Sequence, residues 1–417
     1  MNDLDDHEAQ RKPRGVQAVL LLSMLLASLG TSIANVGLPA LSDAFDAPFP
    51  KVKLVVVAYL VSLTATVLVA GRLGDRFGLK PMLLLGLGIF TTSAMLCGMA
   101  GTLPQLIAAR GAQGIGAAFL MTLSLAMARQ IAPPDRVGQA MGLIASASAL
   151  GTALGPALGG FLMAGFGWHA LFLAQAPGGL LAALLAAALL PAATSSAKTP
   201  RPSFWIMRNG SQMVGLVLNL TVSAVMMATL VVGPFLLTGP LGLTATAVGM
   251  AMAVGPIIST FAGLPSGRFV DRWGPRAAVS LGLLMLATGA LGFALLPERM
   301  GLTGYILTVA ILTPGYQLFQ SGNTTATLAL AAPEARGTIS GLLGLSRNLG
   351  LVLGAWGLGA VFSATAGTTE LGFAEREGVL RGTRDVFLVA AIAMSGALVL
   401  WRRASRTPGQ DRAASVP

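Results

Sequence analysis

Gly71-Arg-Leu-Gly-Asp-Arg-Phe-Gly-Leu-Lys-Pro81 is a charged stretch between two long apolar runs, and the chain contains a second version of it. The second version is Gly267-Arg-Phe-Val-Asp-Arg-Trp-Gly-Pro-Arg276, which also lies between apolar runs. The two stretches are identical at five positions, and their offset of 267 − 71 = 196 residues is close to half of the 417-residue chain. An apolar chain that repeats a charged turn in this way is typical of a transporter built from two parallel halves.

The composition also indicates an integral membrane protein. Hydrophobic residues make up 54% of the chain and charged residues only 10%, which is too little charge to cover a soluble protein of this length. The net charge of +11 does not predict nucleic-acid binding, because the basic residues lie in short segments between apolar runs. With one cysteine, two histidines and no nucleotide-binding loop, the sequence does not predict an enzyme, a metal site or a bound cofactor.

Twelve apolar runs approach or exceed the length of about 20 residues that crosses a bilayer. They are residues 16–39, 53–71, 81–101, 104–128, 138–164, 168–190, 211–237, 246–265, 277–296, 302–328, 337–364 and 385–401. We therefore expect an all-α membrane protein with two pseudo-symmetric six-helix bundles, 16–190 and 211–401. A Pro-, Ser- and Thr-rich linker, 191–210, joins the bundles, and tails at 1–15 and 402–417 flank them.

The Lys and Arg residues predict the orientation of these runs. With the N-terminus inside, cytoplasmic segments contain nineteen of the 27 basic residues and outer loops contain six, while Arg110 and Arg347 lie within the runs. This bias predicts cytoplasmic termini. We expect a multi-pass protein of a bacterial-type inner membrane, in contact with lipid and acting as a monomer.

Several segments resemble the major facilitator superfamily, and within it the drug:proton antiporters. Gly71–Pro81 is similar to the family motif between the second and third helices, and Arg110–Ala117 resembles the fourth-helix motif. Gly151–Gly160 resembles the fifth-helix motif of exporters, and Leu29–Pro39 resembles the first helix of the antiporters. The resemblance covers nearly the whole chain. It implies export of drugs or metabolites by alternating access, driven by a proton gradient.

The sequence departs from the antiporters at two points. The antiporters it resembles usually have fourteen helices, whereas this chain has room for twelve. Their first helix usually carries an acidic residue at the position that Gly30 occupies here.

The repeated charged stretch is the candidate cytoplasmic gate. An acidic side chain at such a turn can accept hydrogen bonds from the N-terminal N–H groups of a facing helix, and the resemblance implies a latch between the halves. The gate residues are Gly71, Arg72, Asp75, Arg76, Gly78, Asp271 and Arg272. The alternative is that these charges only set the topology.

The fifth apolar run contains the candidate hinge, which consists of Gly151, Gly155, Pro156 and Gly159. Glycine permits close helix contact, and proline kinks a helix. Ordinary tight packing is the alternative. A second repeat supports the two halves, because Ala132-Pro133 through Gly142 resembles Ala332-Pro333 through Gly341, at an offset of 341 − 142 = 199 residues.

Polar residues within the runs are candidates for a central cavity and coupling site. They are Asn35, Arg110, Gln113, Gln317, Gln320, Asn323 and Arg347. Arg110 and Arg347 lie about 9 and 15 Å into their runs, where a charge is costly and by default faces a cavity or a protein interface. The alternative is that each arginine only bonds backbone carbonyls across a helix interface.

No acidic residue lies in the middle of a run. An interior with two arginines and no carboxylate favours a neutral or anionic substrate. Proton coupling would then use a residue at the end of a run, and the candidates are Asp43, Asp46, Asp385 and His169. The leading prediction is an exporter of small organic molecules. A facilitator or importer of an organic anion, and a membrane sensor that transports nothing, are the alternatives.

Overall fold

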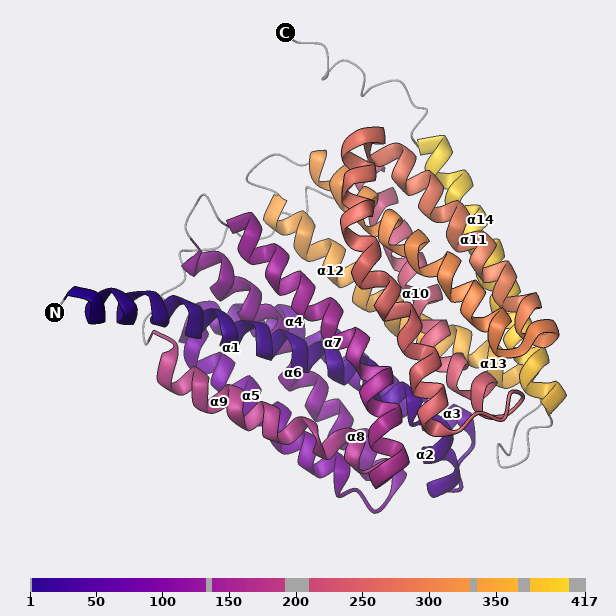
Figure 1. Ribbon diagram of the computed structural model, residues 1–417, viewed down its shortest axis with the longest axis horizontal. Coiled ribbons are helices and arrows are strands. Elements are labelled where there is room, and N and C mark those ends of the chain that lie inside the picture. Colours follow the sequence, from indigo (N-terminus) through magenta and orange to yellow (C-terminus); the bar gives the residue numbers. More distant parts are fainter. Residues whose placement is uncertain (1, 133–136, 192–209, 331–335, 367–375, 405–417) are drawn as a thin grey trace, which may run out of the picture. The chain divides into compact units, whose positions relative to one another are not determined.

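The computed structural model describes residues 2–132, 137–191, 210–330, 336–366 and 376–404, which are helices with short connections (Figure 1). Ten helices in these ranges are long and apolar enough to cross a membrane. One of them, α11 (Ala245–Ala329), has 85 residues and leaves helical geometry at Gly274 and Gly301, so it consists of three consecutive segments. The described residues therefore contain 10 + 2 = 12 membrane-length segments, as the apolar runs predict.

The chain forms two compact units. Among the described residues, the first comprises 2–132, 137–191 and 233–256, and the second comprises 210–232, 257–330, 336–366 and 376–404. The expected bundle boundaries at 190 and 211 stay a prediction. Most of the expected linker and of the C-terminal tail lies outside the described residues.

The first unit is built around α6 (Leu103–Ile131). Its other helices are α1 (Asn2–Val36), α2 (Leu38–Ala44), α3 (Phe49–Val52), α4 (Leu54–Phe77), α5 (Leu79–Gly98), α7 (Val137–Phe166), α8 (Ala170–Leu173) and α9 (Gln175–Leu189). Helix α6 contacts α1, α4, α5 and α7, while α1 lies along α7 and α5 lies along α9 (Figure 1). Leucine and phenylalanine side chains remain exposed on the outer faces of these helices, as Phe161 does at 65%, which suits a lipid environment.

The second unit contains most of α10 (Gly210–Thr238) and of α11, together with α12 (Arg336–Leu353), α13 (Gly359–Thr365) and α14 (Arg376–Ala404). A π-helical turn, Gly354–Leu358, joins α12 to α13. Aromatic rings fill the space between α11 and α14, where Phe293 stacks on Phe387 with ring centroids 4.2 Å apart. Small residues bring the α11 segments together, because a Cβ on Gly282 would lie only 2.6 Å from the Phe319 backbone nitrogen.

The charged stretch 71–81 is not an eleven-residue loop. Helix α4 continues to Phe77, α5 begins at Leu79, and Gly78 alone breaks the helix with φ 94° and ψ 147°. The helix extends because its polar residues are compatible with helical geometry, and it stops where a conformation almost restricted to glycine is required. Gly274 adopts φ 79° and ψ 160°, and 274 − 78 = 196, so the sequence repeat is also a backbone repeat.

Two other expected ends differ from the structure. The first run was expected to reach residue 39, but α1 ends at Val36 because Gly37 precedes a new helix with Pro39 in its first turn. The last run was expected to begin at 385, but α14 begins at Arg376. Its first turns are polar and carry an ion pair between Glu377 and Arg381, so hydropathy alone misses them.

Candidate transport site

Arg110 is the largest fully buried side chain of the described residues, and it lies on α6 with no exposed area. Its Nε donates to the Val55 carbonyl oxygen at 3.2 Å, and its Nη2 donates to the Gly30 carbonyl oxygen at 2.9 Å. Its Nη1 donates to Oε1 of Gln113 at 2.7 Å. The guanidinium thus ties α6 to both α1 and α4. These bonds to carbonyl groups across helix interfaces are the arrangement that the alternative prediction describes.

Two aromatic rings complete the surroundings of Arg110. Its guanidinium carbon lies 4.1 Å from the ring centroid of Tyr59 and 5.7 Å from that of Phe172, both within cation–π range. The Tyr59 hydroxyl donates to the Ala27 carbonyl oxygen at 2.6 Å. Tyr59 was not among the predicted site residues, although it is the one tyrosine in the run 53–71.

A chain of side-chain amides continues from this arginine. The Gln113 Nε2 donates to Oε1 of Gln175 at 3.3 Å, and the Gln175 Nε2 donates to the Leu171 carbonyl oxygen at 2.9 Å. The Cys97 sulfur lies 3.9 Å from Oε1 of Gln113. We call Arg110, Tyr59, Gln113 and Gln175 the arginine centre. Arg110 and Gln113 were predicted from the sequence, whereas Gln175 was missed.

Asn35 is fully buried but is bonded within its own helix. Its amide donates to the carbonyl oxygens of Thr31 and Ser32 at 3.2 and 3.0 Å. Its Oδ1 atom has no hydrogen-bond partner among the described residues. The structure therefore does not join Asn35 to the arginine centre.

The predicted cavity residues of the second unit are bonded separately from one another. Gln317 donates to the Ser259 carbonyl at 3.1 Å and to the Ser259 hydroxyl. Gln320 donates to the Tyr316 hydroxyl, and Asn323 donates to the Gly215 carbonyl, both at 3.1 Å. On α12, Nε of Arg347 is buried without a hydrogen-bond partner in the described ranges.

A groove of about 440 Å³ brings together two of the predicted residues, Asp271 and Gln320, on separate segments of α11. Ser321, Thr324 and Thr325 supply further hydroxyl groups to its lining. Asp271 came from the predicted gate and Gln320 from the predicted cavity. The groove thus links the two sets within the second unit.

The predicted gate residues Arg72, Asp75 and Arg76 are exposed on the last turns of α4. Arg76 lies over the ring of Phe77 at 5.2 Å, and Arg272 lies over the ring of Trp273 at 5.8 Å. The repeat therefore extends to this side-chain contact.

Lys80 is a member of the same motif that was not singled out as a site residue. Its Nζ donates to the carbonyl oxygens of Ala187 and Leu190 at 2.9 and 2.6 Å. These carbonyls lie at the C-terminal end of α9, where a cation complements the helix dipole. Lys80 thus fixes the start of α5 to the end of α9.

The predicted hinge glycines lie where α7 crosses α1 most closely. A Cβ on Gly151 would meet the Leu25 carbonyl oxygen and would lie 3.0 Å from Cβ of Ser28. A Cβ on Gly155 would lie 2.8 Å from Cβ of Ser32. Pro156 is buried inside the helix, and a Cβ on Gly159 would lie 3.3 Å from Ile33.

The second unit contains an equivalent glycine interface that sequence reasoning missed. A Cβ on Gly350 of α12 would meet the Leu220 carbonyl oxygen, and one on Gly354 would lie 2.8 Å from Cα of Ala224. The offsets from the first interface, 350 − 151 and 354 − 155, are both 199 residues, the same as that between Gly142 and Gly341. That offset was the signal that could have revealed them. The π-helical turn begins at Gly354, close to the position equivalent to Pro156.

Comparisons with known proteins agree with this architecture. The sequence profile of the Major Facilitator Superfamily matches residues 20–355. The chain belongs to this superfamily. It is 25% identical over 391 residues to the riboflavin transporter RibZ of Clostridioides difficile, an alignment that covers 81% of this chain and 86% of RibZ. It is 29% identical over 202 residues to the putative multidrug resistance protein MdtD of Salmonella typhi, covering 48% and 43% of the two chains.

A solved structure shows the same fold. It is a bacterial homologue of the human lysosomal transporter Spinster in an inward-facing, unoccupied conformation, with a TM-score of 0.81 and 18% identity. The match covers 94% of this chain and 98% of the homologue. This protein is thus a multi-pass membrane transporter of small molecules and not an enzyme.

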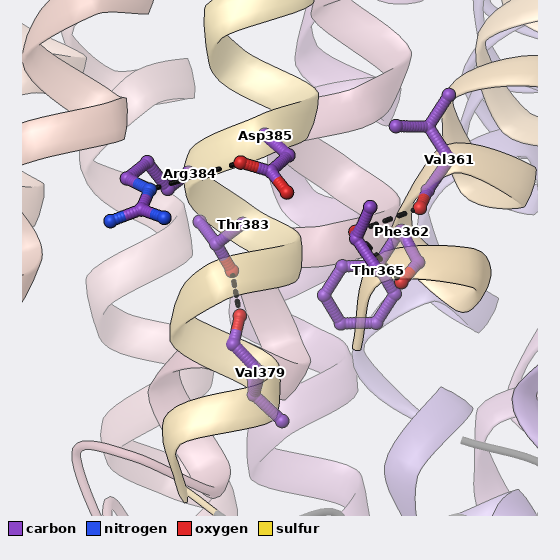
Figure 2. Close-up of polar contacts among 7 residues, drawn as sticks. All are labelled: Val361, Phe362, Thr365, Val379, Thr383, Arg384 and Asp385. Atoms are coloured by element: carbon purple, nitrogen blue, oxygen red, sulfur yellow. Dashed lines mark hydrogen bonds and ion pairs between the residues drawn. The ribbon is translucent and has the colours of Figure 1, made fainter. Parts of the chain in front are cut away.

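The candidate proton-binding residues of the transporter are all at least partly exposed. Asp385 is 37% exposed on α14 and pairs with Arg384, whose Nε lies 3.8 Å from its Oδ1 (Figure 2). Asp43 and Asp46 are exposed near the end of α2. His169 is exposed and stacks on Trp168 with ring centroids 3.8 Å apart.

Proposed function

We propose that the transporter exports small organic molecules, such as drugs or metabolites, by alternating access. The close glycine interface between α7 and α1 supports this proposal, because the same residues carry the resemblance to the exporter motif. A flat, closely packed face lets one helix slide or rock against another without side chains interlocking. The equivalent interface of α12 on α10 gives the second unit the same property.

The substrate of this proposal is neutral or anionic. Arg110 is buried and Arg347 is partly buried at membrane depth. The acidic residues of the described membrane helices lie toward their ends, except Asp385, which lies nine residues after the start of α14. A cation would meet repulsion in such an interior. Riboflavin, which is uncharged at neutral pH and is named as the substrate of RibZ, is a suitable first compound.

The proposed driving force is the proton gradient, with the coupling proton bound at Asp43, Asp46, Asp385 or His169. Asp43, Asp46 and His169 are exposed near helix ends, where they can exchange protons with solvent. Asp385 is partly exposed and lies 385 − 376 = 9 residues after the start of α14. The proposal includes a monomer in a bacterial-type inner membrane with both termini cytoplasmic, as the distribution of Lys and Arg favours.

Reconstituted liposomes with a pH-sensitive dye inside test the proposal. Riboflavin, flavin mononucleotide and ethidium serve as neutral, anionic and cationic compounds, each with and without an imposed proton gradient. We expect riboflavin or flavin mononucleotide to trigger proton flux, and we expect ethidium to trigger none. Transport of ethidium alone would contradict the proposed substrate class.

A facilitator of an organic anion is the second candidate, and the arginine centre favours it because no carboxylate bonds to Arg110 among the described residues. Movement of flavin mononucleotide without proton flux, independent of the gradient, would support this candidate. Failure to move any of the three compounds would contradict the proposed substrates.

A further inference from the structure

The arginine centre holds a charge at membrane depth without an opposite charge. The described hydrogen bonds of Arg110 end on two backbone carbonyls and one neutral amide. Burying an isolated charge is unfavourable unless strong partners replace water. The ring of Tyr59, 4.1 Å from the guanidinium carbon, is the group with the closest negative face.

The position that a carboxylate would need is already occupied. A Cβ on Gly30 would lie 2.7 Å from the Tyr59 hydroxyl and 3.1 Å from its Cζ atom. The hydroxyl is itself fixed by its bond to the Ala27 carbonyl. Tyr59 therefore fills the space beside Gly30, and its ring faces the arginine that is bonded to the Gly30 carbonyl.

Ionisable groups on the surrounding helices are few. On α4 they are Tyr59, Arg72, Asp75 and Arg76; on α5 they are Lys80 and Cys97; and on α6 they are Arg110 and Arg129. Helices α7, α8 and α9, and residues 15–36 of α1, contain none. Asp75, the only acid among them, lies 75 − 59 = 16 residues beyond Tyr59, about 24 Å along the helix at about 1.5 Å per residue.

We propose that Tyr59 acts in place of a carboxylate as the counter-group of Arg110, which makes the arginine centre a permanent positive charge that binds and releases no proton. A coupling proton that the transporter carries therefore binds outside this centre. The proposal concerns the charge of the first unit alone, and it holds for an exporter and for a facilitator.

Thermal unfolding of the purified protein between pH 5 and 8 tests this without any substrate. The measured quantity is the difference in Tm between wild type and Arg110→Gln. If Arg110 had a carboxylate partner, the variant would leave that acid buried and unpaired, and its pKa would rise into this range. The difference would then change with pH, by up to about tenfold in the folded-to-unfolded ratio per pH unit. We expect a difference that is constant with pH, and a difference that varies with pH in this way would overturn the proposal.

The carboxylate swap Gly30→Asp with Tyr59→Leu is the positive control. It removes the ring that blocks position 30 and introduces the missing acid. Adding Arg110→Gln to this swap should produce the pH-dependent difference that the wild-type background lacks. If the Tm difference caused by Arg110→Gln varies with pH in the Gly30→Asp, Tyr59→Leu background but not in the wild-type background, the measurement is able to detect such an acid.

The role of the ring is tested separately. Tyr59→Phe keeps the ring and loses the hydroxyl, with its bonds to the Ala27 carbonyl and the Thr31 side chain. Tyr59→Leu loses both the ring and the hydroxyl. In a double-mutant cycle, we expect Tyr59→Leu and Arg110→Gln to couple by roughly 30-fold in the folded-to-unfolded ratio, since a desolvated cation–π contact contributes about that much. Simple additivity would refute the ring as counter-group.

Should Arg110→Gln not fold, the two Tyr59 variants still decide the question. We expect the Tm difference between Tyr59→Phe and Tyr59→Leu to be the same at pH 5 and pH 8. A difference that disappears at pH 5 would reveal a titrating partner and overturn the proposal. These outcomes do not depend on transport, so failure of the proposed function leaves them readable.

Discussion

Replacing Gly350 by alanine should drive α12 away from α10. The new Cβ would meet the Leu220 carbonyl oxygen and would lie 2.8 Å from Cβ of Ser223, whereas ordinary contact begins at 3.4 Å. The helices must therefore separate locally by at least 3.4 − 2.8 = 0.6 Å, because neither of these groups is the flexible end of a side chain. Overpacking of this kind typically costs about 1–3 kcal/mol.

Gly344→Ala on the same helix is the matched control. A Cβ at this position would meet no atom within 4 Å, so the variant tests helix propensity without a packing change. Alanine is about 1 kcal/mol more favourable than glycine in a helix. We expect Gly344→Ala to unfold at the same or a higher temperature than wild type, and Gly350→Ala at a lower one.

The assay is thermal unfolding of both variants in the same detergent, followed by transport in liposomes at a temperature where both are folded. We expect slower transport for Gly350→Ala and unchanged transport for Gly344→Ala. Equal unfolding temperatures and equal rates for the two variants would refute the reasoning that the α12–α10 interface is tight enough to constrain movement.

Three further experiments test other features. Lys80→Met should lower stability by about 0.3–1 kcal/mol because α9 loses the cation at its C-terminal end, and unfolding curves that match wild type would contradict this. Gly78→Ala and Gly274→Ala should each cost about 1–3 kcal/mol, since their backbone angles are almost restricted to glycine, and the double variant should show the sum in denaturant titrations. Cys97 should resist maleimide in the folded protein because it has no exposed area, and mass spectrometry showing rapid labelling before unfolding would contradict its burial.

The sequence was sufficient for the features that depend on hydropathy and on repetition. Twelve membrane-length segments follow from the apolar runs. The 196-residue offset of the sequence repeat also relates Gly78 and Gly274, whose backbones have similar positive φ angles. Arg110 and Gln113 were predicted to share one helix face, and they are hydrogen-bonded. These features are local, or they repeat a local pattern, so one sequence contains the information.

The missed features depend on which helices are neighbours. Tyr59 is 51 residues from Arg110 in sequence, and nothing in the run 53–71 indicates that its ring faces α6. Gln175 lies on another helix, at the start of α9. The ends of α4 and α14 were also missed, because polar turns continue a helix without contributing to an apolar run. Gly350 could have been predicted, because adding the known offset of 199 residues to the hinge residue Gly151 gives position 350.

Because of the π-helical turn at Gly354–Leu358, the packing of the second unit depends on the number of residues in this segment as well as on their types. A π turn accommodates one more residue than an α turn, and each residue rotates an α-helix by about 100°. The turn thus lets Gly350 and Gly354 face α10 while Phe362 of α13 packs against Gly382 of α14, where a Cβ would lie 3.0 Å from the ring. A chain shorter by one residue here could keep only one of these two faces in register.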